Sequence, residues 1–307
     1  MKTSITYLAC VGACLIQLTV QGSTLAATDL LQKYRMTPQA TGEVAPANQY
    51  ILVIYDSSAQ PSERLLAAHS LANDLNRSEI ELLYRFLKAH PSEAESNVPG
   101  LRYVKNEVFE ALRQQLVVPA DLVKVSSEIY RDTAQDVVTR DYAVQNLVNC
   151  LEEGVGSAAQ EKQIYKTLLE VAHDGTSIAG TALVGLDRAV AATAVAENKH
   201  INDIAVSVAC SATADSAARA SAMQVCARRG LAQILPAAEA LAHGSPPVPL
   251  RMSAIAAIGK LGGASQLALL EQLQQENDPE LTAALESAVA ALHKRIGRNI
   301  VMTQALP

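Results

Sequence analysis

Charged side chains that could do chemistry are densest in one short stretch of the chain. It holds three Asp, one Gln, one Arg and one Tyr, namely Asp132, Gln135, Asp136, Arg140, Asp141 and Tyr142. Paired carboxylates can act as general acid and base when their environment tunes one of them to hold a proton near neutral pH. The alternative is a structural role, in which the same groups bond helix ends and turns.

The six histidines form no metal-binding motif. No two of them stand four residues apart, as a helical zinc site requires, and His-Glu-x-x-His is absent. His90, His173 and His243 each close an expected helix, where a partial positive charge is favourable. The sequence therefore predicts no metal site.

A glycine-rich segment, Gly154-Val155-Gly156-Ser157, loosely imitates a dinucleotide-binding loop. That fingerprint follows a strand, whereas a helical pattern ending at Glu153 precedes this segment. We therefore expect a turn between helices and no cofactor. The chain also lacks a Gly-x-Ser-x-Gly elbow and a phosphate-binding Gly-Lys-Ser/Thr. The sequence predicts no catalytic residues and a protein that is not an enzyme.

Residues 1–26 have the features of a signal peptide. Lys2 provides a positive charge, residues 5–20 are mostly apolar, and small residues around Ala26 and Ala27 suit cleavage after either one. We expect a periplasmic or secreted protein that is not an integral membrane protein after cleavage. An uncleaved anchor and lipidation at Cys14 are the alternatives.

Net charge excludes two classes of partner. The chain has 25 basic and 31 acidic residues, and the leader carries one basic residue and no acid, so the mature chain has 24 − 31 = −7. This argues against a general nucleic-acid binder and against a protein held on anionic lipid. Cys150, Cys210 and Cys226 remain after cleavage and are interpreted as small buried residues, with a Cys210–Cys226 bridge left open.

A short pattern that recurs along the chain predicts the elements that position these residues. A basic or polar residue is followed by a small residue three positions on and an aliphatic or small residue seven positions on. Four copies of the pattern begin at Arg64, Arg140, Arg219 and Arg251, and looser copies begin at Lys105, Ser177 and Leu285. Successive anchors are 41, 35, 37, 42, 32 and 34 residues apart. A period in this range is typical of a helical solenoid.

Apolar residues at helical spacing predict paired helices from Pro61 onward. Ser78 is the expected N-cap of one helix, with Glu81 completing a capping box. Residues 50–55 read locally as a strand, but no second β-rich run could pair with them. We therefore expect a capping helix there, with Ile51, Ile54 and Tyr55 on one face. The last helix is expected to end near Ile296.

The segment from Leu250 to Gly262 resembles the first helix of a HEAT-like repeat of the short bacterial type. Residues 278–292, 215–219 and 139–143 are similar to it, and the resemblance covers about 60–296. It implies an all-α fold, a right-handed α-solenoid of about six to seven HEAT-like helical hairpins that binds proteins. An Asp before the first helix and an Arg within it commonly bond the next repeat's turn in this family, which implies a structural role for the polar stretch 132–142.

The expected organisation is a signal peptide at 1–26, a tail and capping segment at 27–60, a solenoid at 61–296 and a tail at 297–307. The expected function is that of an exported non-enzymatic scaffold for an unknown protein or peptide. The alternative is an enzyme or small-ligand carrier that uses the solenoid groove, since some bacterial relatives of such repeats are bilin lyases.

The predicted partner surface is formed by the second helix of each pair, which we expect on the inner, concave side. Its members fall off the apolar stripes and should face solvent: Arg85, Lys88, Lys124, Glu128, Arg131, Lys162 and Lys166. Most are basic although the chain is acidic, which suggests a partner with acidic character; a merely solvated face is the alternative.

Overall fold

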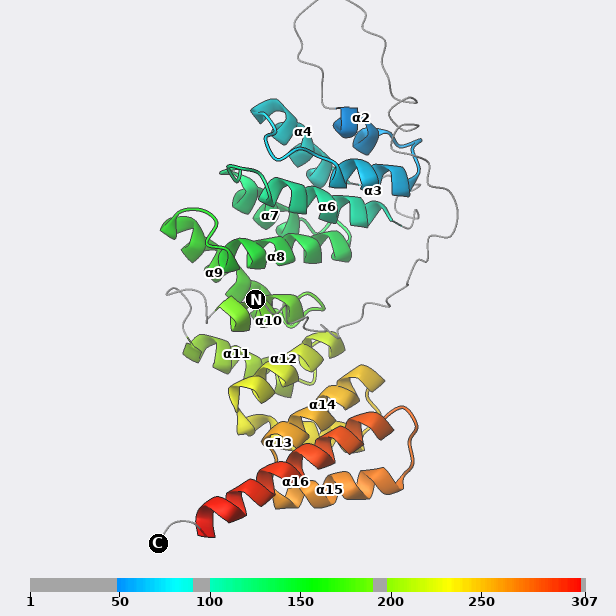
Figure 1. Ribbon diagram of the computed structural model, residues 1–307, viewed down its shortest axis with the longest axis vertical. Helices are drawn as coiled ribbons and strands as arrows, with labels where there is room; N and C mark the ends of the chain where they lie inside the picture. The colour runs from blue at the N-terminus through cyan, green and yellow to red at the C-terminus, as the bar shows by residue number, and fades with distance from the viewer. Residues whose placement is uncertain (1–48, 91–99, 190–197, 305–307) are drawn as a thin grey trace, which may run out of the picture.

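The computed structural model describes residues 49–90, 100–189 and 198–304, with side chains up to Ile296. The described residues form helices, turns and loops without a strand (Figure 1). The all-α prediction is confirmed, and residues 50–55 are helical as expected. The predicted leader and the tail up to residue 48 lie outside the described residues.

The predicted helices are present, but they do not pack in the predicted pairs: from residue 122 onward, the second helix of each predicted pair packs more extensively on the helix that follows it than on the helix before it. The helices are α2 (Gln49–Tyr55), α3 (Pro61–His69), α4 (Arg77–Lys88), α6 (Leu101–Arg113), α7 (Leu122–Arg131), α8 (Val137–Glu152), α9 (Ala158–His173), α10 (Ala179–Ala189), α11 (Asn198–Cys210), α12 (Ser216–Arg229), the 3-10 turn η1 (Ala232–Ile234), α13 (Leu235–His243), α14 (Val248–Leu261), α15 (Ala264–Gln275) and α16 (Thr282–Gln304).

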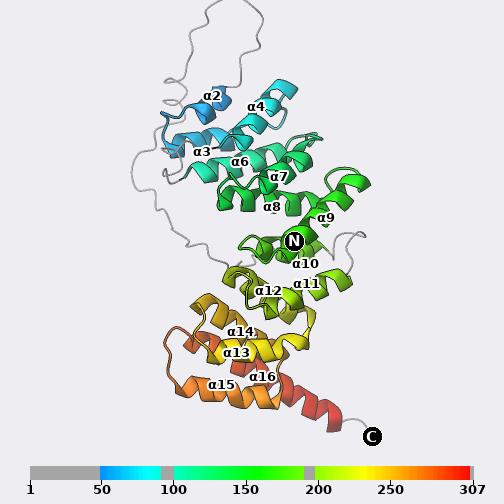
Figure 2. The same cartoon turned by 180° about the vertical axis from the view of Figure 1, so that it is seen from behind.

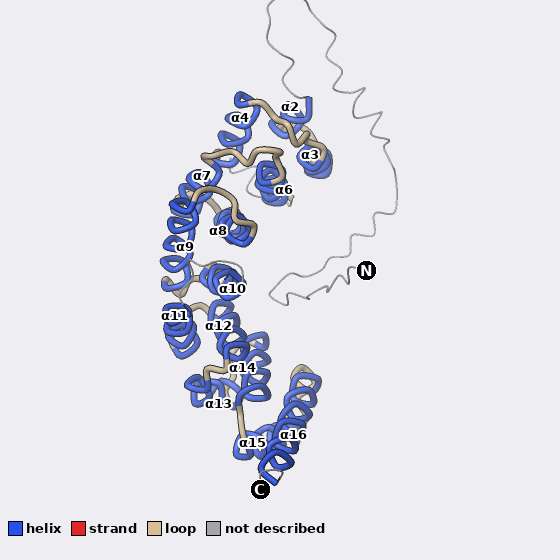
Figure 3. The backbone as a smooth tube through the Cα atoms, turned by 60° about the vertical axis from the view of Figure 1, so that its left-hand side comes forward, coloured by secondary structure: helices blue, strands red, loops and turns tan. Residues whose placement is uncertain are grey.

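The helices stack in chain order along the long axis, as both faces of the molecule show (Figures 1 and 2). One layer contains α3, α6, α8, α10, α12, α14 and α16, each packed on the next. We call it the anchor layer, because its helices contain every anchor residue of the sequence pattern except Ser177, which lies just before α10. The outer layer contains α4, α7, α9, α11 and α13 (Figure 3).

The stack is curved, with the anchor layer on the inner side of the arc (Figure 3). The prediction that the second helices form the inner face is therefore wrong. Small residues bring the anchor helices close together: Gly185 of α10 lies against Val148 of α8, and Gly259 of α14 lies against Ala288 of α16. Outer-layer neighbours pack on each other less extensively. A stack bends toward its more closely spaced layer, which accounts for the curvature.

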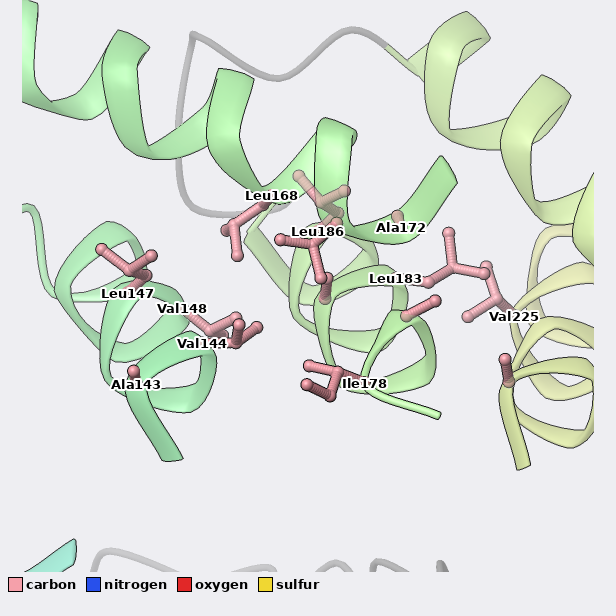
Figure 4. Close-up of a cluster of buried hydrophobic side chains, with 14 of the residues drawn as sticks. Ala143, Val144, Leu147, Val148, Leu168, Ala172, Ile178, Leu183, Leu186 and Val225 are labelled. Atoms are coloured by element: carbon pink, nitrogen blue, oxygen red, sulfur yellow. The ribbon is translucent and has the colours of Figure 1, made fainter. Parts of the chain in front are cut away.

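Aliphatic side chains between and along the layers form the core (Figure 4). Leu147 and Val148 of α8 lie near Leu168 of α9 and near Leu183 and Leu186 of α10. Each buried aliphatic side chain of this kind stabilises the fold by about 1.5–3 kcal/mol. The core therefore positions every surface helix through its immediate neighbours.

Two helix boundaries differ from expectation. Asn76, not Ser78, is the N-cap of α4: its side chain accepts from the amides of Ser78 and Glu79, and Glu79 bonds back to the Asn76 amide. The last helix does not end near Ile296, because α16 continues to Gln304. A glycine inside a helix costs only about 1 kcal/mol, so Gly297 does not force an end there.

Four of the five basic anchors share one role in the structure. Arg64, Arg140 and Arg251 each donate from Nε to the penultimate carbonyl of the preceding helix, at 2.8, 2.8 and 2.9 Å. Lys105 donates from Nζ to the carbonyl of Ala89, just after α4, at 2.8 Å. The last carbonyls of a helix have no partner inside it and favour positive charge. Arg219 departs from the pattern, since its buried Nε has no hydrogen-bond partner within the described residues.

Arg251 also reaches forward along the chain, and this leads to a stability prediction. Its Nη1 lies 3.0 Å from Asp278 Oδ2, ahead of α16, and its side chain is 16% exposed. Arg251→Ala should lower the free energy of unfolding by about 1–3 kcal/mol, because it leaves two acceptors without their donor. The matched control is Arg77→Ala, since Arg77 is 93% exposed. Equal urea midpoints for the two variants would reject the anchoring role.

Candidate functional site

The polar stretch 132–142 bonds to helix ends. Asp136 accepts from the amides of Val138 and Thr139 and so caps α8. The buried Gln135 donates to the carbonyl of Lys88 at 2.9 Å and accepts from Lys105 at 3.0 Å. These bonds tie the start of α8 to the preceding helices.

All three acidic residues of this stretch have altered pKa values. Although burial opposes it, hydrogen bonds from the Thr139 hydroxyl and from the amides of Thr139 and Val138 lower the pKa of Asp136. The hydrogen bond with His90, whose Nε2 lies 2.6 Å from Asp132 Oδ2, lowers the pKa of Asp132. Burial raises the pKa of Asp141, although hydrogen bonds to Thr181 and Gln145 oppose the shift. Each carboxylate thus interacts with a structural neighbour, and the contacts suit a network that joins helices.

The cysteines have no nucleophilic character where they are buried. Burial raises the pKa of the Cys150 and Cys226 thiols to about 12, so both stay protonated at neutral pH. The prediction that all three cysteines are buried is wrong for Cys210, which ends α11 and is exposed. The three thiols are unbridged. The described residues contain no cluster of His, Cys, Asp and Glu that could hold a metal ion.

The predicted partner surface lies on three consecutive helices of the outer layer. All seven of its residues are exposed, as predicted. Arg85 and Lys88 are on α4, Lys124, Glu128 and Arg131 on α7, and Lys162 and Lys166 on α9. We call this set the outer basic surface.

Ion pairs join neighbouring helices across the outer basic surface. Lys88 Nζ lies 2.6 Å from Glu128 Oε2 and links α4 to α7. Arg131 Nη2 lies 3.4 Å from Glu170 Oε2 and links α7 to α9, and Lys166 is 4.0 Å from the same carboxylate. These exposed pairs contribute little to stability, but they orient the side chains.

The acidic groups do not balance the cations on these helices. Arg85, Lys124 and Lys162 form no ion pair with any described residue. The exposed cations of α4, α7 and α9 are Arg77, Arg85, Lys88, Lys124, Arg131, Lys162 and Lys166, whereas the exposed acids are Glu81, Glu128 and Glu170. A surface with excess positive charge therefore stands on a chain of net charge −6.

Sequence reasoning missed a second row of ion pairs at the ends of the anchor helices. Arg113 of α6 pairs with Glu153, next to α8, and Glu152 of α8 pairs with Arg188 of α10. Asp187 of α10 pairs with both Arg228 and Arg229 of α12. The available signal was the adjacent charged dipeptides 152–153, 187–188 and 228–229, which recur at about the period of the anchors.

Comparisons with other proteins assign the chain to no family, so a functional proposal rests on the geometry described above. No helix of the described chain is long and apolar enough to cross a membrane. The sequence matches no protein-family model, and no curated protein is significantly similar to it.

Proposed function

We propose that the chain is a right-handed α-solenoid of about six to seven HEAT-like hairpins that acts as a non-enzymatic scaffold outside the cytoplasm. In this proposal, the outer basic surface binds an acidic segment of a partner protein. The observation that carries it is the cation excess on α4, α7 and α9, with Arg85, Lys124 and Lys162 unpaired among the described residues.

Two features support the solenoid part of the proposal. Each anchor helix packs on the next one in its layer, and the other extensive contacts among the described helices join neighbours along the chain. Moreover, Arg64, Lys105, Arg140 and Arg251 bond carbonyls at the ends of the helices before them. This contact between successive helices recurs with the same period as the sequence pattern, as stacked repeat units require.

Electrostatics supports the acidic partner. Exposed cations without acidic neighbours create a positive potential that attracts an acidic segment and speeds its association. The ion pairs Lys88–Glu128 and Arg131–Glu170 hold the neighbouring side chains in place, which reduces the ordering cost of binding. Because exposed pairs are weak, carboxylates of a partner can replace Glu128 and Glu170 at little cost.

Charge reversal at the unpaired cations tests the proposal. We expect the variant Arg85→Glu, Lys124→Glu, Lys162→Glu to lose at least about tenfold in capture of the partner that the wild-type protein retains from an envelope extract. Each substitution replaces an attraction by a repulsion at a place where no intramolecular ion pair is broken. Circular dichroism should show unchanged helix content.

The matched control is Arg102→Glu, Lys199→Glu, Lys260→Glu, which changes the net charge equally at exposed positions away from α4, α7 and α9. This control should retain the partner. Equal capture by both triple variants at the same salt concentration would show that the outer basic surface is not the binding site.

A further inference from the structure

The three cations of the outer basic surface that form no ion pair are placed alike on their helices. Each stands one helical turn before a residue of an ion pair: Arg85 before Lys88 on α4, Lys124 before Glu128 on α7, and Lys162 before Lys166 on α9. Residues three or four positions apart share a helix face. The three cations therefore lie on the same exposed face as the ion pairs that join the helices.

Two contacts fix the register between α4 and α7. Lys88 pairs with Glu128, so the partners are 128 − 88 = 40 positions apart. Just beyond the two helix ends, His90 Nε2 lies 2.6 Å from Asp132 Oδ2, and these residues are 42 positions apart. The later residue of α4 thus meets the later residue of α7, so the two helices run in the same direction.

Two contacts likewise fix the register between α7 and α9. At the start of the helices, Gln160 Nε2 donates to the carbonyl of Ala120 at 3.0 Å, and these residues are 40 positions apart. At the end, Arg131 pairs with Glu170, 39 positions later. Start meets start and end meets end, so α7 and α9 are also parallel.

This register brings the three cations into one row across the outer layer. Lys124 follows Arg85 by 124 − 85 = 39 positions, and Lys162 follows Lys124 by 162 − 124 = 38 positions. These separations differ from those of the contacting residues by one to three positions, or about 1.5–4.5 Å along a helix axis, which is less than one turn. We call Arg85, Lys124 and Lys162 the cation row.

The acidic groups beside the cation row pair with other residues. Glu81 and Glu128 lie one turn away from the row on α4 and α7, and each of them pairs with another cation of α4. Asp121, which precedes α7, forms no ion pair with the row within the described part of the chain. The cation row therefore remains available to carboxylates from outside the chain.

The spacing of the helices indicates what conformation a bound segment would have. Packed neighbouring helices have axes about 8–10 Å apart. A polyproline II segment has three residues per turn and rises about 3.1 Å per residue, so every third side chain returns to the same side about 9 Å further on. In a β-strand, side chains three positions apart point to opposite sides. Only the first conformation matches the cation row with side chains at a regular interval of three.

We propose that the outer basic surface binds an extended, polyproline II-like segment of the partner with an acidic residue at every third position. The segment runs across α4, α7 and α9 along the long axis of the stack, and each carboxylate meets one member of the cation row. This inference rests on the proposed function and adds the conformation of the acidic segment and the spacing of its acids.

Two synthetic peptides of identical composition test the spacing. In one, two prolines separate each glutamate from the next, and in the other the three glutamates are consecutive and the prolines flank them. Fluorescence anisotropy at low salt should show that the wild type binds the spaced peptide at least about threefold more tightly, because only this peptide reaches all three cations at once. Both peptides have the same net charge, so long-range attraction alone does not distinguish them.

The variant Ser78→Arg, Arg85→Ser provides a matched control on the protein. It exchanges two exposed residues of α4, keeps the composition and net charge, and moves one cation about 10 Å along the helix, out of the row. The spaced peptide should lose its advantage over the consecutive one in this variant, while circular dichroism shows unchanged helix content.

The possible failures are distinguishable. Equal affinity of the wild type for the two peptides, or an advantage of the spaced peptide that survives the exchange, would overturn the inference. The proposed function still stands in that case if Arg85→Glu, Lys124→Glu, Lys162→Glu weakens the binding of both peptides. If neither peptide binds the wild type at low salt, or if this triple variant binds both as tightly as the wild type, the proposed function fails as well.

Discussion

Asp187→Ala is expected to lower the free energy of unfolding by about 2–4 kcal/mol. The Asp187 side chain is 11% exposed, and its two oxygens lie 2.7 and 2.6 Å from the Nε atoms of Arg228 and Arg229. Arg229 is 12% exposed and, among the described residues, would keep the side-chain oxygens of Asn198 and Asn202 as its acceptors. A largely buried guanidinium would thus lose the one carboxylate that pairs with it in the described part of the chain, and the urea midpoint should fall accordingly.

An exposed pair provides the control for this prediction. Arg77 and Glu81 pair at 3.2 Å with side chains that are 93% and 52% exposed, so Glu81→Ala should change stability by less than about 0.5 kcal/mol. Adding Arg229→Leu to Asp187→Ala should recover part of the loss, because the buried charge then disappears with its partner. If Asp187→Ala unfolds at the same urea concentration as Glu81→Ala, Asp187 does not join α10 to α12.

Local patterns were sufficient to predict the helices but not which of them pack together. Apolar periodicity depends on neighbours three and four residues away. It predicts helices at about 134–153, 157–173 and 248–262, within a few residues of the observed α8, α9 and α14. The basic anchors were also visible, because Arg64, Arg140 and Arg251 recur with small residues three positions on. Their hydrogen-bond acceptors were not visible, since these are set by where the preceding helix ends.

The N-cap of α4 shows why a local pattern can be ambiguous. Asn76 and Ser78 are both good capping residues, and each is followed three residues later by a Glu. Local propensity does not separate these two starts. The loop before α4 determines which residue caps the helix. The backbone amide of Leu75 donates to the Gln115 side chain at 2.9 Å, and Leu75 is itself buried. These contacts fix the chain just ahead of Asn76.

The curvature and the ion pairs depend on spacing between helices, which the sequence does not contain explicitly. The apolar stripes correctly predicted that all seven residues of the outer basic surface are exposed. They did not predict that these residues lie on the outer side of the arc. That position results from close approaches within the anchor layer, such as Gly185 against Val148. Glycines inside helices were the available signal for these approaches.

Gly185→Leu is expected to lower the free energy of unfolding by about 3 kcal/mol or more. A Cβ at Gly185 would stand 2.2 Å from Val148 Cγ2, 2.6 Å from Cγ1 and 3.0 Å from Cβ. Val148 is 2% exposed and has a stiff, branched side chain, so it cannot turn away from the added atoms. Helices α8 and α10 must therefore separate, and urea unfolding should show the loss. Ala256→Leu, on the exposed side of α14, is the control and should change stability by less than about 0.5 kcal/mol.

A double-mutant cycle assigns this effect to the contact between the two helices. Gly185→Ala adds only the Cβ and gains about 1 kcal/mol in helix propensity, so its net loss should be smaller than that of Gly185→Leu. Val148→Ala removes Cγ1 and Cγ2, the two atoms closest to the new Cβ, and keeps the Val148 Cβ at 3.0 Å. The double variant Gly185→Ala, Val148→Ala should therefore be more stable than the sum of the single losses predicts, with a coupling of about 1 kcal/mol or more. Strict additivity would mean that α10 can shift freely, and the close packing of the anchor layer would then not explain the curvature of the stack.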